Sequence, residues 1–274
     1  MPAHTVIAPD KLARLIGLPG SPTILDLRDR PAKSIPGSRS PIGPDPLGWS
    51  LTDRDAVVVV DTDGAGPAVS AAAILRSEGI AAEVLEGGFA AWTAAALPTV
   101  SLAHLPPRHD DGRTWWVTRA RPKVDRIACP WLIRRFVDPD ARFLFVAPAE
   151  VLTVAASQQA EPFDIADERV FWSHRGERCT FDIMIEAFGL GAHAPLARLA
   201  EIVRGADTER LDLAPEAAGL LAISLGLSRS HADDHVQLDA GMAIYDALYR
   251  WCRDAQGERH DWTSHRPGRA QVTA

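Results

Sequence analysis

Cysteine is scarce in this chain, and apolar runs long enough to cross a bilayer are absent. Three cysteines occur among 274 residues, and a small, odd and dispersed set does not form the disulfide framework of a secreted domain. The N-terminal residues carry no charged segment followed by an apolar one, and no stretch reaches the ~18 apolar residues of a membrane span. These absences predict a cytoplasmic protein with no membrane partner.

Positive charge is also in deficit, with 29 lysines and arginines against 36 acidic residues and a net charge of −7. Such a balance, without a basic recognition helix, argues against a nucleic-acid partner. The length has room for two domains. The polar, proline-containing segment 101–114 is the predicted linker between residues 1–100 and 115–255, and residues 256–274 form a polar tail.

The first 100 residues alternate apolar strands with helices. Residues 57–60 are a run of four valines, which is typical of a strand buried on both faces. A helix is predicted over 68–78, after Pro67, and another strand over 82–85. Strand, helix and strand at these lengths predict an α/β domain with a parallel sheet and right-handed crossovers.

The order of the segments ILDLRD, SIPGS, VVVVDTDG, AAAILRSEG and VLEGGFAAW resembles a rhodanese domain. In active rhodaneses the loop after the buried strand carries a cysteine that becomes persulfidated. The matching position here is Asp61, or Thr62 if the match is offset by one residue, and the first 128 residues contain no cysteine. Asp61 and Asp63 would also repel the anionic thiosulfate. The resemblance therefore implies a rhodanese-like module that is not an active sulfurtransferase but docks a protein partner or supports the structure.

The stretch WWVTRARPKVDRIACPWLIRRF, residues 115–136, concentrates basic residues in an acidic chain. Because proline favours the first position of a helix, we expect a helix to begin at Pro130 with Cys129 as its N-cap. A helix N-terminus favours an anion and lowers the pKa of a thiol, which makes Cys129 the candidate redox thiol. The alternative is a small buried cysteine beside a solvated basic loop. The predicted ligands of a small oxyanion are Arg119, Lys123, Arg126 and Arg134.

A second group of residues has the chemistry of a metal site. Cys179, Asp182 and Glu186 follow His174 at three- and four-residue spacing, which places them on one helical face. Imidazole, thiolate and carboxylate groups on facing helices are typical ligands of a divalent metal such as Zn or Fe. The alternative is an ion-paired surface with Cys179 in the core. The predicted ligands are His174, Cys179, Asp182, Glu186 and His235.

From residue 115 onward the chain is predicted to be mostly helical α+β. Residues 115–253, including WVTRARPKVDRIACPWLIRRFVDPDARFLFV and FDIADERVFWSHRGERCTFDIMIEAFGL, resemble the C-terminal domain of the chromate-resistance ChrB family. The family is associated with chromate resistance and with regulation of the accompanying operon. In its usual layout a presumed DNA-binding region precedes this domain, and here a rhodanese-like domain stands in that position.

The residues and the resemblance together predict a cytoplasmic accessory protein of chromate resistance. It binds an oxyanion such as chromate or sulfate, or a metal ion, and carries a non-catalytic rhodanese-like module. Two alternatives stay open at this point. One is a redox enzyme that depends on a metal or on a thiol, and the other is a regulator of a chromate-resistance operon.

Overall fold

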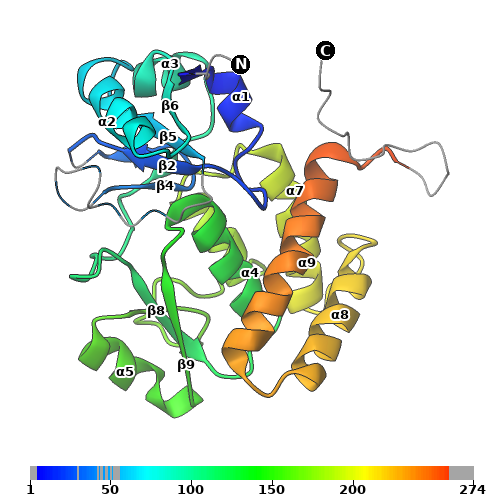
Figure 1. Cartoon of the computed structure of the whole chain (residues 1–274). Coiled ribbons are helices and arrows are strands. Elements are labelled where there is room, and N and C mark those ends of the chain that lie inside the picture. Colours follow the sequence, from blue (N-terminus) through cyan, green and yellow to red (C-terminus); the bar gives the residue numbers. More distant parts are fainter. Residues whose placement is uncertain are drawn as a thin grey trace.

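The computed structural model describes residues 5–29, 31–41, 43, 46, 49, 51 and 56–258. Beyond residue 258 the predicted polar tail lies outside the described residues. An α/β unit that contains the N-terminal sheet lies above a mostly helical C-terminal part in Figure 1. No helix in the described part of the chain has the length and apolar character that a bilayer crossing requires.

A parallel five-stranded sheet forms the centre of the N-terminal unit, in the order β1-β6-β5-β2-β4. Its strands are β1 (Val6–Ile7), β2 (Thr23–Asp26), β4 (Ser38–Arg39), β5 (Val57–Val60) and β6 (Ala82–Leu85). Its helices are α1 (Pro9–Ala13), α2 (Gly66–Ser77) and α3 (Gly88–Ala94). The predicted α/β fold with a parallel sheet is confirmed, and β5 is buried on both faces as its valines predict.

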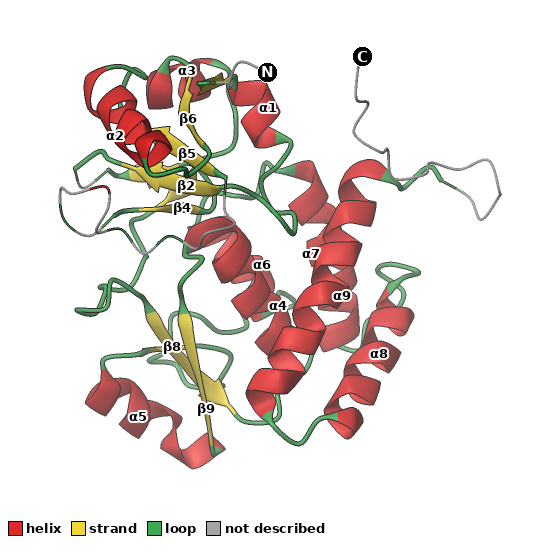
Figure 2. Ribbon diagram, in the orientation of Figure 1, coloured by secondary structure: helices red, strands yellow, loops and turns green. Residues whose placement is uncertain are grey.

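The C-terminal part combines a small parallel sheet, in the order β10-β8-β9, with a group of packed helices (Figure 2). Its strands are β8 (Trp115–Arg119), β9 (Arg142–Val146) and β10 (Glu161–Pro162). Its helical segments are α4 (Asp125–Leu132), η2 (Ile133–Val137), η3 (Pro148–Glu150), α5 (Val151–Gln158), α6 (Thr180–Ala187), α7 (Ala194–Asp207), α8 (Ala217–Ser230) and α9 (Asp234–Asp254). This arrangement confirms the predicted mostly helical α+β fold.

The two parts share one apolar core. Leu12 and Trp92 from the N-terminal unit belong to the same buried cluster as Trp131 and Phe136 from the C-terminal part. A short antiparallel pair, β3 (Lys33–Ser34) with β7 (Val100–Ser101), leads into the connecting segment. That segment is attached to the C-terminal part, because the Ser101 N–H donates to the Phe188 carbonyl (2.9 Å) and Arg108 pairs with Asp138 (3.0 Å).

The start of the helix that carries Cys129 differs from the prediction. α4 begins at Asp125 rather than at Pro130, so Pro130 lies inside the helix and Cys129 is not an N-cap. Proline lacks an N–H for the intrahelical hydrogen bond, so packing must offset the loss. Pro130 and its neighbours are buried against the helices around them. Tertiary burial therefore overrides the local helix-start signal.

The last long helix, α9, begins at a carboxylate N-cap. Ser230 is the last residue of α8, and the cap of α9 is Asp233. The Asp233 carboxylate accepts hydrogen bonds from the backbone N–H groups of His235 and Val236. A carboxylate suits this position because it carries a full negative charge at the positive end of the helix dipole.

Gly88 provides a test of the fold. Its φ of +57° is unfavourable for other residues, and a Cβ there would lie 2.5 Å from the Gly64 nitrogen. We expect Gly88→Ala to lower the free energy of unfolding by more than ~1 kcal/mol in a denaturant titration. Gly219→Ala in α8 is the control, since nothing lies within 4 Å of its added Cβ. Equal midpoints for the two variants would contradict this account.

Candidate metal centre

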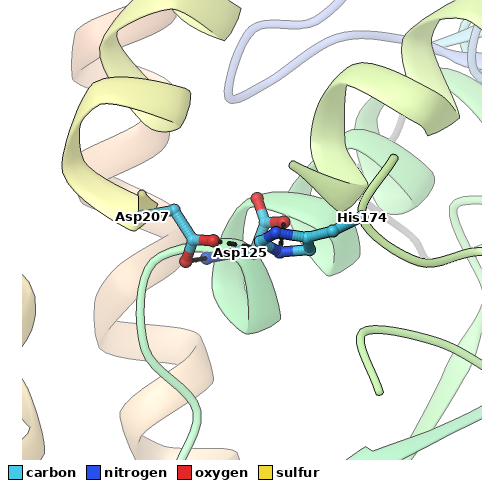
Figure 3. Close-up of side chains that lie close together, drawn as sticks. All are labelled: Asp125, His174 and Asp207. Carbon is cyan, nitrogen blue, oxygen red and sulfur yellow. Dashed lines mark hydrogen bonds and ion pairs between the residues drawn. The ribbon is translucent and has the colours of Figure 1, made fainter. Parts of the chain in front are cut away.

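His174 lies among three aspartates that come from distant parts of the sequence. Its Nε2 atom lies 3.2 Å from a carboxylate oxygen of Asp207, 3.4 Å from one of Asp164 and 3.5 Å from one of Asp125. Figure 3 shows the His174 ring pointing toward the carboxylates of Asp125 and Asp207. Asp125 is the first residue of α4 and Asp207 the last of α7, while His174 lies in the loop before α6. Helix ends and a loop therefore bring these groups together.

The Asp125 carboxylate is fully buried at the point where two helices begin. Its Oδ2 atom accepts hydrogen bonds from the backbone N–H groups of Thr180 (2.6 Å) and Phe181 (3.3 Å) at the start of α6. Its Oδ1 atom is buried with no hydrogen-bond partner among the described residues. Burial raises the pKa of Asp125 to about 7, and the nearby charge of Asp207 adds to this effect. The centre thus contains an oxygen that lacks a cation or a donor.

Two arginines hold Asp164 in place. Its Oδ2 atom pairs with Arg119 (3.0 Å) and with Arg126 (3.2 Å), and Thr180 Oγ1 donates to its Oδ1 atom (3.2 Å). Burial would raise the pKa of Asp164, but the hydrogen bond from His174 and the two guanidinium charges lower it. Asp164 is therefore an ionised carboxylate beside the imidazole.

His174 supplies the positive charge among the three carboxylates. Hydrogen bonding to Asp125, and then to Asp164 and Asp207, raises the pKa of His174 to about 12. The His174 side chain is 40% exposed, so the group is reached from solvent while Asp125 lies beneath it. His174 therefore holds its proton tightly, and the Nε2 atom that faces the carboxylates is the atom through which it would bind a metal ion.

Three of these residues also have the spacing of a metal site. Asp125, His174 and Asp207 each offer one ligand atom, and these atoms lie within 4.8 Å of one another. One imidazole nitrogen with carboxylate oxygens suits Zn²⁺, Fe²⁺ or Mn²⁺. Asp164 contacts the same imidazole and would orient it. The donor set therefore fits a divalent metal ion.

Of the predicted metal ligands, the structure places only His174 in this cluster. Asp182 pairs with Arg204 (3.1 Å), and Glu186 pairs with Arg178 (2.6 Å). Cys179 is buried, and burial raises the pKa of its thiol. His235 packs edge-on against Phe145, with ring centroids 5.3 Å apart. The helical spacing did place Cys179, Asp182 and Glu186 along one helix, but the two carboxylates pair with arginines instead of facing His174.

The predicted oxyanion ligands are also separated. Arg119 and Arg126 share Asp164, whereas Arg134 pairs with Asp239 (3.6 Å). The Lys123 side chain is exposed and makes no hydrogen bond or ion pair with the residues that the structure describes. The four side chains therefore do not converge on one helix start.

The environment of Cys129 contradicts a reactive thiol. Cys129 is fully buried inside α4, and burial raises the pKa of its thiol, with the charge of Asp125 acting in the same direction. A reactive cysteine needs a lowered pKa and access to solvent. The alternative of a small buried cysteine is the one that the structure supports.

Asp61 has a structural role in the rhodanese-like loop. Its two carboxylate oxygens accept hydrogen bonds from the backbone N–H groups of Gly64 (2.6 Å) and Ala68 (3.0 Å). The Asp61 side chain thus closes the loop between β5 and α2. The backbone N–H groups of Gly64 and Ala68 therefore already have an anionic acceptor in the Asp61 carboxylate.

Comparison with known proteins places the C-terminal part in a family. Residues 116–252 match the family described as ChrB, C-terminal domain, and this match covers half of the chain. The chain belongs to the ChrB C-terminal domain family. Protein ChrB of Cupriavidus metallidurans is 35% identical over 147 residues, which are 52% of this chain and 43% of that protein. The chain thus matches less than half the length of this ChrB relative.

Solved structures similar to part of this chain include rhodanese-related proteins. One from Thermoplasma volcanium is 23% identical and covers 35% of this chain and 98% of its own, with a TM-score of 0.31. A thiosulfate sulfurtransferase from Pseudomonas aeruginosa is 29% identical and covers 36% of this chain and 20% of its own, with a TM-score of 0.30. The α/β fold of the N-terminal unit follows from its own parallel strand order and not from these similarities.

The protonation of the centre predicts how stability depends on pH when no metal is added. His174 has its pKa raised from 6.5 to about 12, and Asp125 from 3.8 to about 7, so the folded state binds protons more tightly than the unfolded state. The contribution of Asp125 to stability is therefore lost between about pH 4 and 7, and that of His174 between about pH 6.5 and 12. Both contributions fall as pH rises. We expect chelator-treated protein to melt at a lower temperature at about pH 9 than at about pH 6.

His174→Gln should reduce this dependence of the melting temperature on pH, because it removes the group with the larger shift. The control is His231→Gln, which removes an imidazole outside the aspartate cluster. If His174→Gln and the parent protein lose stability equally between the two pH values, the described protonation of the centre is wrong.

A further prediction concerns the rhodanese-like loop. The protein should release no thiocyanate from thiosulfate and cyanide, because the loop has no thiol at Asp61 or Thr62. Asp61→Ala should instead lower the free energy of unfolding by about 1–3 kcal/mol, since two N–H groups lose their acceptor. Asp63→Ala is the control, because its carboxylate accepts one exposed hydrogen bond from Ala65 (3.2 Å). Thiocyanate release that disappears in Asp61→Ala would refute this interpretation.

Proposed function

We propose that this protein is a cytoplasmic accessory of chromate resistance that binds a divalent metal ion through Asp125, His174 and Asp207. Membership of the ChrB C-terminal domain family supports the physiological role. The geometry of the cluster supports the ligand. The observation that carries the metal proposal is the buried Oδ1 atom of Asp125, which has no partner among the described residues.

A buried carboxylate without a full set of partners is costly, and a cation beside it removes that cost. Without a metal, the compensating charge comes from the proton on His174. A divalent ion would replace this proton, because imidazole coordinates a metal through a deprotonated nitrogen. Arg119 and Arg126 hold Asp164 beside the imidazole from the other side, so the orientation of His174 is fixed before any ion binds.

The alternatives have less support. An oxyanion at Arg119 and Arg126 would compete with Asp164, which both guanidinium groups already contact. Thiol redox chemistry would need an exposed cysteine, but all three cysteines are buried. A regulatory role gains no support from the ChrB relative as a whole, since this chain matches 43% of its length. We propose that the rhodanese-like unit is a non-catalytic module that docks a protein partner, since Asp61 closes its loop.

The proposal predicts saturable binding of a divalent metal to chelator-treated protein. Calorimetric titration with Zn²⁺, Fe²⁺ and Mn²⁺ should show one site. His174→Ala and Asp207→Asn should each weaken it by about a hundredfold or more, as expected when a metal loses one ligand. At about pH 8, where Asp125 is already mostly ionised, binding should release about one proton and strengthen about tenfold per pH unit, because the metal competes with the His174 proton.

The matched control is Asp212→Asn, which makes the same charge change at a carboxylate that is 67% exposed and paired with Arg210. Circular dichroism of each variant checks the fold. Metal at a hundredfold excess over Kd should also raise the stability of the parent by about 2.7 kcal/mol but not that of His174→Ala. If the parent binds none of the three metals, or His174→Ala binds them as tightly, the metal proposal fails.

A further inference from the structure

A second group of cationic side chains surrounds a hollow that the proposed metal site does not use. The hollow has a volume of about 380 Å³ and lies between the start of β9 and the first turn of α9. Its ionisable lining residues are Arg113, Arg134, Asp140, Arg142 and His235. None of them belongs to the aspartate cluster around His174.

The charges around the hollow are not balanced within it. The one carboxylate of the lining, Asp140, pairs with Arg39 (3.3 Å) rather than with a lining arginine. Among the described residues, no carboxylate lies within ion-pair distance of the guanidinium groups of Arg113 and Arg142; their charges help to lower the pKa of Asp111, which does not line the hollow. Three arginines therefore line a concave surface on a chain with a net charge of −7. Such a local excess of positive charge favours an anionic ligand.

The Arg142 guanidinium is held against an aromatic ring and donates no hydrogen bond to the residues that the structure describes. Its guanidinium carbon lies 4.6 Å from the ring centroid of Trp115. The Trp115 ring is stacked in turn with His109, with centroids 4.5 Å apart and an interplanar angle of 17°. Stacking uses the face of a guanidinium and leaves the N–H groups at its edge available for an oxyanion.

Arg134 is restrained on the other side of the hollow. Its Nε atom donates to the Ala141 carbonyl (3.4 Å), and its guanidinium carbon lies 5.1 Å from the Phe143 ring centroid. Its ion pair with Asp239 is long, at 3.6 Å, and the Asp239 side chain is 76% exposed, so water screens it. Restrained arginines lose little conformational entropy when they bind a ligand.

We propose that this hollow binds a tetrahedral oxyanion, with Arg142 and Arg134 as the principal donors and with Arg113 and His235 at its rim. Planar guanidinium groups donate two parallel hydrogen bonds to such an anion, which suits sulfate and phosphate groups. The volume exceeds that of one tetrahedral anion, so the class includes both the free inorganic ion and a small phosphate monoester. The site would act independently of the proposed metal centre, since they share no residue.

The test is calorimetric titration of the full chain at constant ionic strength with inorganic sulfate, inorganic phosphate and glycerol phosphate. We expect saturable binding of at least one probe, weakened about tenfold or more by Arg142→Gln and by Arg134→Gln, because each removes a charge-assisted donor. Tighter binding of glycerol phosphate than of inorganic phosphate identifies a monoester as the ligand, and the reverse order identifies the free ion.

Arg14→Gln is the control, because it removes the same charge from α1, where Arg14 pairs with Asp10 (3.1 Å). A second measurement is protection of Arg142 and Arg134 from phenylglyoxal by the same anion, followed by mass spectrometry of peptides. Protection of both residues in the folded parent protein supports the site even where a variant fails to fold. Absence of saturable binding, or an equal loss in Arg14→Gln, would overturn the proposal.

Discussion

The C-terminal part of this protein depends on a carboxylate that is buried where two helices begin. Asp125 opens α4, and its side chain accepts hydrogen bonds from the first N–H groups of α6. The loop of His174 and the end of α7 meet at the same point. Burial of a carboxylate is costly unless positive charge and donors surround it. Positive charge at this point therefore stabilises the packing of these elements, and the protonated His174 supplies it.

Asp61 in the N-terminal unit shows how the same chemical group can have a different outcome. Both of its oxygens accept hydrogen bonds from backbone N–H groups in the loop and at the start of α2, so the carboxylate is satisfied locally. In Asp125 one oxygen is satisfied by α6 and the other has no partner among the described residues. Only the second arrangement leaves binding capacity for a ligand, which is why the proposed function lies in the C-terminal part.

Sequence patterns predicted the elements that are determined locally. The strand at 57–60 is a continuous run of valines, and the strand at 82–85 is apolar except for Glu83, so both are set by their local sequence. The start of α4 was wrong because Pro130 is a local signal, whereas burial of the whole segment determines the helix. The sequence predicted His174 as a metal ligand because histidine is a common ligand type. Its partners Asp125, Asp164 and Asp207 lie at separate element ends and in a loop, so no spacing in the sequence relates them.

At the proposed metal site, the choice of metal would follow from the competition between a metal ion and the proton of His174. The carboxylates that attract a cation also raise the pKa of His174, so any ion must displace a tightly bound proton. Mg²⁺ and Ca²⁺ bind imidazole weakly and gain little from that displacement. Zn²⁺ and Fe²⁺ form strong bonds to imidazole nitrogen and to carboxylate oxygen. The arrangement around His174 should therefore reject the abundant hard cations and retain transition metals.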